Sequence, residues 1–361
     1  MTLEQLLGFA LSRSLFPPTT LRAAIERLGF VQADPIRAPA RAQDLMLRQR
    51  VRDYRAGDLE RHYGKLGIEE DFFVNYGFVP RSVHALMHPR KARTPWSAVT
   101  SRRAKALLAF VGKHGEVHPR EVDAHFAHGT VTNYWGGSSS ATTHLLDAMH
   151  YRGLLRVVRR ERGVRIYGLR TQSTALSVAT QRANLDALID VIVSTYAPLP
   201  ARSLNALLAR MRYATPQWVG QLKAAIDRAK QRLAHAHLEG VTWYWPADED
   251  PARAPEQNSD ESLRLLAPFD PVVWDRRRFE IFWGWDYRFE AYTPVSKRRF
   301  GYYALPLLWR TRVIGWGNLV AQGDELDASF GYVRGSAPRD RDFKRELERE
   351  LERVRGFLTP R

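Results

Sequence analysis

The sequence contains no cysteine among its 361 residues. Disulfide bonds, a thiolate nucleophile, a cysteine-ligated zinc ion and a cysteine-held iron–sulfur cluster are therefore excluded. Three common catalytic motifs are also missing, namely a Gly-x-x-x-x-Gly-Lys phosphate loop, a Gly-x-Ser-x-Gly elbow and a His-Glu-x-x-His pair. We expect no cofactor and no metal ion, although His84 and His88 are spaced i, i+4 and would need a converging third ligand.

Long hydrophobic runs are lacking as well. The longest, such as Leu107–Val111 and Val191–Val193, are far shorter than the roughly 18 residues of a membrane-spanning helix. An apolar patch at Leu6–Leu11 follows Glu4 rather than a basic segment, and no small-residue cleavage site comes after it. The sequence predicts a protein without a membrane segment that is cytoplasmic and associated with the nucleoid.

Acidic residues are few. The chain has 39 Asp and Glu against 55 Lys and Arg, which gives a formal net charge of +16 at pH 7. Because 44% of the residues are hydrophobic, this is a folded chain rather than a disordered basic tail. Such a charge favours a polyanionic partner, by default nucleic acid. A solvated basic surface without a partner is the alternative.

The patterning predicts a mainly α fold with β (α+β), in which tandem winged-helix (helix-turn-helix) units precede a small C-terminal β-barrel and a terminal helix. Apolar residues at helical spacing predict helices at residues 3–12, 20–28, 39–50, 101–113, 119–126, 138–150, 181–196, 201–211 and 215–234. A predicted hairpin follows the helix at 138–150, which gives the element order of a winged helix. The predicted domains are residues 1–95, 96–172, 173–247 and 260–361, with a proline-bearing linker at 247–259.

The C-terminal region has a different texture. Residues 263–330 are rich in aromatic residues and valine, and they alternate at 288–293, 302–308 and 312–320, which predicts the strands of an all-β barrel. Trp283, Trp285 and Trp316 are expected in its core. A helix with charges at i, i+4 spacing is predicted over residues 338–355.

Basic residues gather in clusters that suit a phosphate backbone. One cluster precedes the second domain, one lies at the tip of the predicted hairpin, and two lie in the β region. The expected DNA-binding residues are Arg37, Arg41, Arg102, Arg103, Arg159, Arg160, Arg162, Lys297, Arg298 and Arg299.

Several segments together resemble one family. They are Leu-Gly-Phe-Val-Gln-Ala-Asp-Pro-Ile at 28–36, Arg-Ala-Gln-Asp-Leu at 41–45, Trp-Gly-Gly-Ser at 135–138, His-Tyr-Arg-Gly-Leu-Leu at 150–155, Leu-Leu-Ala-Pro-Phe-Asp-Pro-Val-Val-Trp-Asp-Arg at 265–276 and Lys-Arg-Arg-Phe-Gly-Tyr-Tyr at 297–303. Over nearly the whole chain these are similar to the AlkZ/YcaQ family of DNA glycosylases, which carries Gln-x-Gln or Gln-x-Asp where this chain has Gln32 and Asp34. Gln43-Asp44 stands where the family often has a His-His pair, which indicates a divergent branch.

The resemblance implies three tandem winged helices and a β-barrel that surround duplex DNA. It also implies excision of bulky N7-alkylated purines, including the unhooking of interstrand crosslinks, with Gln32 and Asp34 as the catalytic pair. The implied partner is double-stranded DNA with alkylated bases, bound by a monomer. No lysine is close to this pair in sequence, so the glycosylase is expected to be monofunctional.

The chemistry of the pair can be reasoned from its spacing. In an extended segment, residues i and i+2 point to the same face, so Gln32 and Asp34 should project together. A carboxylate can stabilise the positive charge that develops on the sugar and take a proton from the attacking water, while the amide holds that water. An N7-alkylguanine is already cationic and leaves without a general acid, so one carboxylate is enough. The structural alternative is that Asp34, which precedes Pro35, is only a turn residue.

Two other classes of function remain open at this stage. A non-catalytic winged-helix DNA-binding protein or transcriptional regulator would share the same basic clusters, but no dimerisation helix is evident. A nuclease would need a cluster of acidic residues for two metal ions, which the sequence lacks.

Overall fold

The computed structural model describes residues 1–132, 137–171, 175–253, 262–323 and 325–359. The chain folds as two compact units and passes between them several times. Unit 1 contains residues 1–58, 189–208 and 226–361, and unit 2 contains residues 59–188 and 209–225. The boundaries fall within or at the ends of four helices: α4 (Asp58–His62), α9 (Val178–Tyr196), α10 (Ala201–Ala209) and α12 (Leu222–Arg232).

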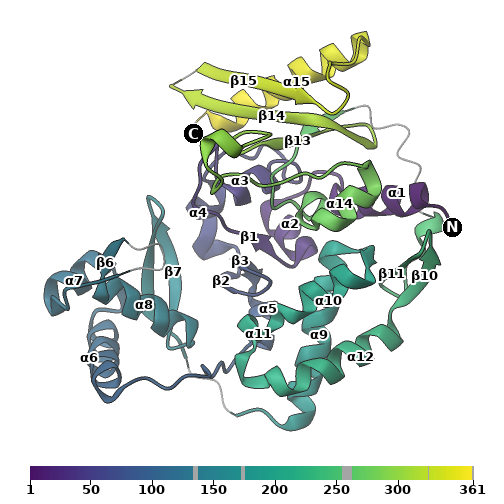
Figure 1. The fold of residues 1–361 in the computed structure, drawn as a ribbon. Coiled ribbons are helices and arrows are strands. Elements are labelled where there is room, and N and C mark those ends of the chain that lie inside the picture. Colours follow the sequence, from purple (N-terminus) through teal and green to yellow (C-terminus); the bar gives the residue numbers. More distant parts are fainter. Residues whose placement is uncertain (133–136, 172–174, 254–261, 324, 360–361) are drawn as a thin grey trace. The chain divides into compact units, whose positions relative to one another are not determined.

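Unit 1 begins with helices and ends with a four-stranded sheet followed by a long helix (Figure 1). Its elements are α1 (Leu3–Ser14), α2 (Leu21–Leu28), β1 (Val31–Gln32), α3 (Ala42–Leu47), β9 (Leu199–Pro200), β10 (Ala234–Leu238), β11 (Val241–Trp245), η3 (Pro251–Arg253), β12 (Leu263–Leu265), α13 (Pro271–Trp274), α14 (Arg276–Trp283), η5 (Val295–Lys297), β13 (Leu305–Trp309), β14 (Arg312–Gln322), β15 (Glu325–Tyr332) and α15 (Arg341–Leu358). Strands β10, β11 and β9 form one small antiparallel sheet.

Unit 2 alternates short helices with short strands. Its elements are η1 (Tyr63–Lys65), β2 (Ile68–Phe72), β3 (Tyr76–Pro80), α5 (Arg81–Leu86), α6 (Ala98–His114), β4 (Glu116–Val117), α7 (Pro119–Phe126), β5 (Thr130–Thr132), β6 (Ser138–Ser140), α8 (Ala141–Tyr151), β7 (Leu155–Glu161), β8 (Val164–Leu169), α11 (Met211–Ala214) and η2 (Pro216–Gln221). The helices and the hairpin of residues 98–169 follow the predicted order, with β4, β8 and β7 in one sheet. Their assignment as a winged helix stays a prediction. Trp135 and Gly136, from one of the segments that carry the resemblance, lie outside the described residues, as do residues 254–259 of the predicted linker.

The predicted C-terminal β-barrel is wrong. The four strands form an antiparallel sheet in the order β12-β13-β14-β15, in which β12 and β15 are edges rather than neighbours. The all-β prediction also missed α14, although its caps are present in the sequence: the Asp275 carboxylate accepts backbone bonds from Arg277 and Arg278, and Gly284 ends the helix with φ 73°. No strand forms at the predicted position 288–293, where the chain is irregular and then turns, with the Thr293 N–H bonded to the Glu290 carbonyl.

Apolar residues from both ends of the chain form the core of unit 1. Leu11 and Leu15 of α1 pack with Val272, Phe279 and residues of the C-terminal sheet. The three tryptophans expected in the core, at positions 283, 285 and 316, pack against this cluster while remaining partly exposed. Helix α15, predicted over 338–355, begins at the Asp340 cap and buries Phe343 against Trp309.

One buried ion pair also joins these distant segments. Arg50 donates to both carboxylate oxygens of Asp270, at 2.8 and 2.9 Å, and neither side chain is exposed. The same guanidinium donates to the carbonyls of Ser14 and Met46. Because every charged group here is hydrogen-bonded, the desolvation of the pair is compensated, and the residues after Asp270 are held against the N-terminal helices. No described helix is long and apolar enough to cross a membrane.

Candidate active site

Gly29 sets the geometry of the segment that carries Gln32 and Asp34. It ends α2 in the left-handed region with φ 67°, and its N–H bonds to the Ile25 carbonyl. A Cβ at this position would lie 2.7 Å from Val191 Cγ1, so only glycine fits. The chain leaves the helix extended, and Val31–Gln32 form β1 as predicted.

Gln32 is held by a tryptophan that the sequence analysis did not identify. The Gln32 side chain is 3% exposed, and its Oε1 accepts a hydrogen bond of 2.9 Å from Trp274 Nε1. Because an indole N–H can only donate, this contact fixes which end of the amide is oxygen. The Gln32 NH₂ group makes no hydrogen bond within the described part of the chain.

Asp34 is a half-buried carboxylate without an ion-pair partner among the described residues. One oxygen, Oδ1, accepts the Ile36 N–H at 2.9 Å. Asp34 therefore does stabilise a turn through this oxygen, as the structural alternative expected. No described residue hydrogen-bonds to Oδ2. Burial raises the pKa of Asp34, and the Ile36 hydrogen bond opposes this only in part. A carboxylate with a raised pKa and one available oxygen is suited to accept a proton.

The neighbour of the pair in α3 is Gln43. Its Oε1 accepts the Asp34 backbone N–H at 3.4 Å and so supports the segment that carries Gln32 and Asp34. The adjacent Asp44 carboxylate accepts from Tyr54 Oη at 2.7 Å and from the Gly57 N–H. Burial raises the pKa of Asp44 although these bonds oppose it. Gln43 and Asp44 therefore both make hydrogen bonds to other residues of unit 1.

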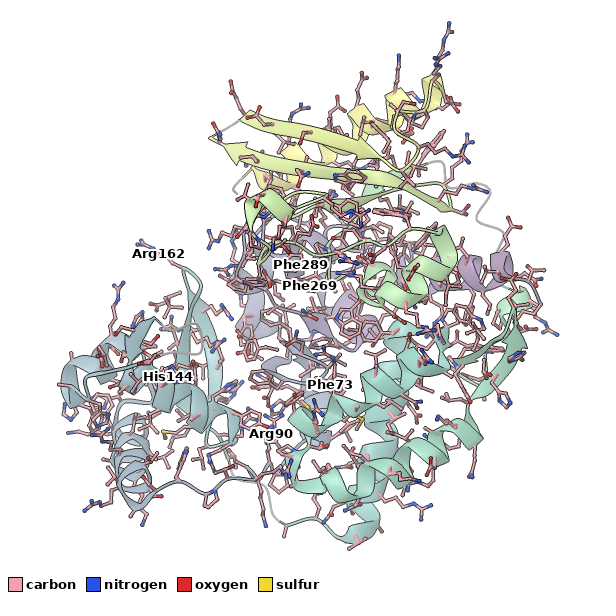
Figure 2. All side chains as sticks on the ribbon, viewed as in Figure 1. Phe73, Arg90, His144, Arg162, Phe269 and Phe289 are labelled. Atoms are coloured by element: carbon pink, nitrogen blue, oxygen red, sulfur yellow. The ribbon has the colours of Figure 1, made fainter. Side chains whose placement is uncertain are left out.

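Two tyrosines of the loop between α14 and β13 respond to the charge of Asp34. The pKa values of Tyr303 and Tyr292 are raised, first by burial and next by the negative charge of Asp34. Tyr303 is buried and Tyr292 is 66% exposed. Phe289 contacts the Tyr303 ring edge-on at 5.3 Å between centroids and packs on Phe269 at 5.1 Å (Figure 2). This loop is therefore aromatic as well as basic.

The loop that carries these tyrosines is held by a buried acid. The Glu290 carboxylate accepts the backbone N–H groups of Arg299, Phe300 and Gly301, at 2.9, 2.8 and 3.4 Å for Oε2. Glu290 is 4% exposed, so these donors compensate for its burial. As a result the basic segment 297–299 and Tyr303 are fixed within one short stretch of chain.

Five of the expected DNA-binding residues belong to unit 1. Arg37 and Lys297 are exposed, as is Arg299, whose guanidinium lies over the Phe300 ring. Arg298 donates to the Thr293 carbonyl and lies over Tyr302. Arg41 caps α3, and its charge acts on the Asp44 carboxyl. Segment 297–299 therefore belongs to the same unit as Gln32 and Asp34.

The other five belong to unit 2. Arg102 and Arg103 are exposed on α6, and Arg162 is exposed at the tip of the β7–β8 hairpin (Figure 2). Arg159 pairs with Glu116 and Glu161. Arg160 is different, because its side chain is 10% exposed and makes two bonds, 2.6 and 2.7 Å long, to the buried Glu70 carboxylate. A phosphate would therefore meet Arg162 more readily than Arg160.

The histidine pair noted in the sequence lies in a buried polar cluster of unit 2. Nε2 of His84 and Nε2 of His88 each lie 3.0 Å from Asp71 Oδ2, and the three potential ligand atoms lie within 4.8 Å of one another. Arg90 donates to the other Asp71 oxygen at 2.6 Å, and Arg170 contacts His84 Nδ1 at 3.2 Å. Two guanidinium groups at this distance oppose a metal cation. The arrangement is better described as a hydrogen-bonded cluster with neutral histidines, and burial lowers the pKa of His84 to about 3.

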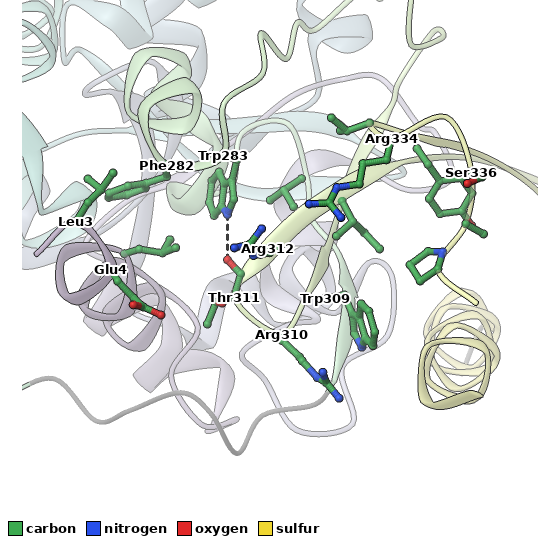
Figure 3. A pocket seen from close by; sticks show the side chains of 17 residues that line it. Leu3, Glu4, Phe282, Trp283, Trp309, Arg310, Thr311, Arg312, Arg334 and Ser336 are labelled. Carbon is green, nitrogen blue, oxygen red and sulfur yellow. Dashed lines mark hydrogen bonds between the residues drawn. The ribbon is translucent and has the colours of Figure 1, made fainter. Parts of the chain in front are cut away.

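A separate hollow of about 860 Å³ lies in unit 1 beside the β13–β14 turn (Figure 3). Trp283, Trp309 and Tyr332 line it together with Arg310, Arg312 and Arg334. The Trp283 indole N–H bonds to the Thr311 carbonyl at 2.9 Å. Neither Gln32 nor Asp34 lines this hollow. Although it is large, we assign it no role in the chemistry proposed for these two residues.

Sequence reasoning missed Trp274 as the hydrogen-bond partner of Gln32. Trp274 lies in a segment that carries the family resemblance, residues 265–276. That shared pattern was the only available signal, because 242 positions separate Gln32 from its tryptophan.

The Asp34 carboxylate has an oxygen without a hydrogen-bond partner among the described residues, and Trp274 orients the Gln32 amide on a strongly basic chain. Groups of these kinds are the ones that hydrolysis of a nucleic-acid substrate uses. The family model described as DNA glycosylase AlkZ-like matches residues 25–357. The chain belongs to this AlkZ-like DNA glycosylase family, as the sequence resemblance indicated. Its class is therefore that of DNA-binding hydrolases that act in DNA repair.

Proposed function

We propose that this protein hydrolyses the N-glycosidic bond of N7-alkylated purines in duplex DNA, including bulky adducts and interstrand crosslinks. The observation that carries the proposal is the state of Asp34, whose Oδ2 has no hydrogen-bond partner among the described residues while Trp274 fixes the adjacent Gln32 amide. One carboxylate suits a substrate whose leaving group is already cationic. An undamaged base would also need a general acid.

Each of these residues has a separate role in the proposed reaction. As the bond to N9 lengthens, the Asp34 carboxylate stabilises the positive charge on the sugar and accepts a proton from the attacking water. The Gln32 NH₂ group donates to an oxygen of the substrate or of that water. The exposed Lys297 and Arg299 bind phosphates beside the site. We propose that the exposed arginines of unit 2 also bind phosphates of the DNA.

The direct test is an excision assay without metal. Duplex DNA containing N7-methylguanine is incubated with the protein in EDTA and then treated with alkali, which cleaves abasic sites. Strand cleavage only after alkali supports the proposal. Cleavage that needs metal and no alkali would instead indicate a nuclease, and binding without abasic sites would indicate a non-catalytic DNA-binding protein. The same assay on a duplex with an N7-linked interstrand crosslink, read as separated strands, tests unhooking.

A further inference from the structure

The hollow beside the β13–β14 turn combines basic and aromatic side chains (Figure 3). The described residues that line it include three arginines and one acid, Glu4, so its wall carries an excess of positive charge. Its aromatic residues include Trp309 and Tyr332. A volume of about 860 Å³ falls within the range of about 300–1,000 Å³ that small-molecule sites occupy. The hollow is therefore large enough to hold a ligand that carries both a ring and a negative charge.

Two arginines of the hollow lack a counter-charge. Arg312, at the start of β14, and Arg334, after β15, are both exposed, and neither side chain makes a hydrogen bond or an ion pair with any residue that the structure describes. Within the same described residues, the Glu4 carboxylate that lines the hollow pairs with neither of them. In Figure 3 the two guanidinium groups extend into the same part of the hollow. An anion bound there would provide the missing negative charge and accept their N–H groups.

Another arginine-lined hollow of unit 1 differs in this respect. It has a volume of about 600 Å³ and five arginines line it. However, Arg48 and Arg353 pair with the buried Glu350 carboxylate, and Arg52 donates to the Pro18 carbonyl at 3.3 Å. Guanidinium groups that already have acceptors gain less from an added anion. The arginines of the first hollow are therefore the ones whose binding capacity is unused.

The aromatic wall of the first hollow is fixed by packing. Trp309 on β13 and Tyr332 on β15 both contact Phe343 of α15, with centroid distances of 5.3 and 6.1 Å and interplanar angles of 70° and 71°. Neither ring is therefore stacked face to face on Phe343, and both remain partly exposed. The Arg310 guanidinium lies over the Trp309 ring, 4.8 Å from its centroid. Because the rings are held before a ligand binds, little freedom is lost on binding.

This combination selects a ligand with a flat ring and an anionic group. A heteroaromatic ring stacks on tyrosine and tryptophan, and guanidinium groups bind phosphate through paired N–H donors. An anion without a ring leaves the aromatic wall unused, and an apolar molecule leaves the arginines unused. A nucleotide carries both groups in one molecule, and the net charge of +16 on the chain favours such an anion.

We propose that this hollow is a nucleotide-binding site, in which Arg312 and Arg334 bind the phosphate while the base stacks against Trp309 and Tyr332. Neither Gln32 nor Asp34 lines it, so binding there does not require the excision chemistry. Two sources present the same chemical group, namely a free nucleotide and a nucleotide of an unpaired DNA strand. The recognised unit is a base and a phosphate joined by a sugar in both cases.

The test is isothermal titration calorimetry of the full chain with dAMP, deoxyadenosine and inorganic phosphate. dAMP should bind at least about 10-fold more tightly than either fragment, because it alone uses the rings and the arginines together. Arg312→Gln and Arg334→Gln should each weaken dAMP binding about 10-fold through the loss of a charge-assisted contact. The matched control is Arg277→Gln, which should bind dAMP like wild type, because Arg277 is exposed on α14 of the same unit and does not line the hollow.

Tyr332→Leu tests the stacking contribution separately. It should weaken dAMP binding about 10-fold and leave the binding of inorganic phosphate unchanged, because only the base uses the ring. A short single-stranded oligodeoxyadenylate then distinguishes the two sources. Tighter binding than dAMP, weakened by the same substitutions, supports the site with an unpaired DNA strand as its source. Equal or weaker binding than dAMP supports the site with a free nucleotide as its source.

Four results would overturn the inference. The first is no binding of dAMP at millimolar concentration, and the second is equal affinity for dAMP and inorganic phosphate, which would indicate an anion site without base recognition. The third is the same loss of affinity in Arg277→Gln as in Arg312→Gln, which would indicate attraction to a basic surface in general. The fourth is a polyglutamate peptide that binds more tightly than the oligodeoxyadenylate, which would indicate an acidic protein partner. Every readout here is binding, so a failure of the excision assay leaves these outcomes unaffected.

Discussion

Replacing Asp34 by asparagine removes one negative charge and almost nothing else. Asparagine retains the side-chain oxygen that accepts the Ile36 N–H, so the turn should persist. A carboxylate about 4 Å from the developing positive charge is worth about 4 kcal/mol at an effective dielectric constant of 20, a value suited to a half-buried group. Since 1.36 kcal/mol corresponds to a factor of ten, Asp34→Asn is expected to lower the excision rate about 1,000-fold.

The assay is single-turnover release of N7-methylguanine from end-labelled duplex DNA at saturating protein. Binding of the same duplex is followed by fluorescence anisotropy. Affinity should be equal to wild type or slightly higher, because a negative charge near the phosphates is removed. A rate within tenfold of wild type would refute the electrostatic role of Asp34, and a parallel loss of affinity would show that the charge supports binding instead.

The pH dependence of the same rate follows from the burial of Asp34. Only the ionised carboxylate is active, and burial raises its pKa, so the rate should fall on acidification with a midpoint above the ordinary value of about 3.9. The raised pKa also means that the ionised group disfavours the folded state above that midpoint, so Asp34→Asn should melt higher at neutral pH. A midpoint at or below the ordinary value would contradict the burial argument.

Three further changes test the surroundings of the site. Trp274→Phe removes the indole donor that orients the Gln32 amide and should lower the excision rate about 10- to 100-fold at unchanged DNA affinity. The control is Trp283→Phe, which loses an indole hydrogen bond elsewhere in unit 1 and should keep the wild-type excision rate. Asp270→Ala leaves the Arg50 guanidinium buried without its carboxylate partner and should lower the free energy of unfolding, measured in urea, by about 3–5 kcal/mol. A decrease below about 1 kcal/mol would show that the pair is not desolvated. Lys297→Gln should reduce the slope of log affinity against log salt by about 0.9, and an unchanged slope would exclude a phosphate contact there.

Local features of the fold could be predicted from the sequence because they depend on neighbouring residues. Helix α2 ends at Gly29 and the next residues are extended, as the glycine and Pro35 indicate. Whether a sheet closes into a barrel could not be predicted in the same way. Alternation of polar and apolar residues indicates that a segment is a strand, but it does not indicate which strand lies next to it. Alternation therefore predicted strands at 302–308 and 312–320, which correspond to β13 and β14, although β13 begins only at Leu305. The predicted barrel was wrong.

The candidate site was predictable only in its local part. Gln32 and Asp34 share a short extended segment, so their spacing was informative. Trp274 reaches that segment through tertiary packing, which no local period encodes. Its hydrogen bond to the Gln32 amide is therefore visible only in the structure.

Unit 1 is assembled from three stretches of chain that lie far apart in the sequence. Gln32 and Trp274 belong to two of these stretches, and 242 positions separate them. A polypeptide that ends before residue 274 therefore lacks the indole N–H, and its Gln32 amide is left without the donor that orients it.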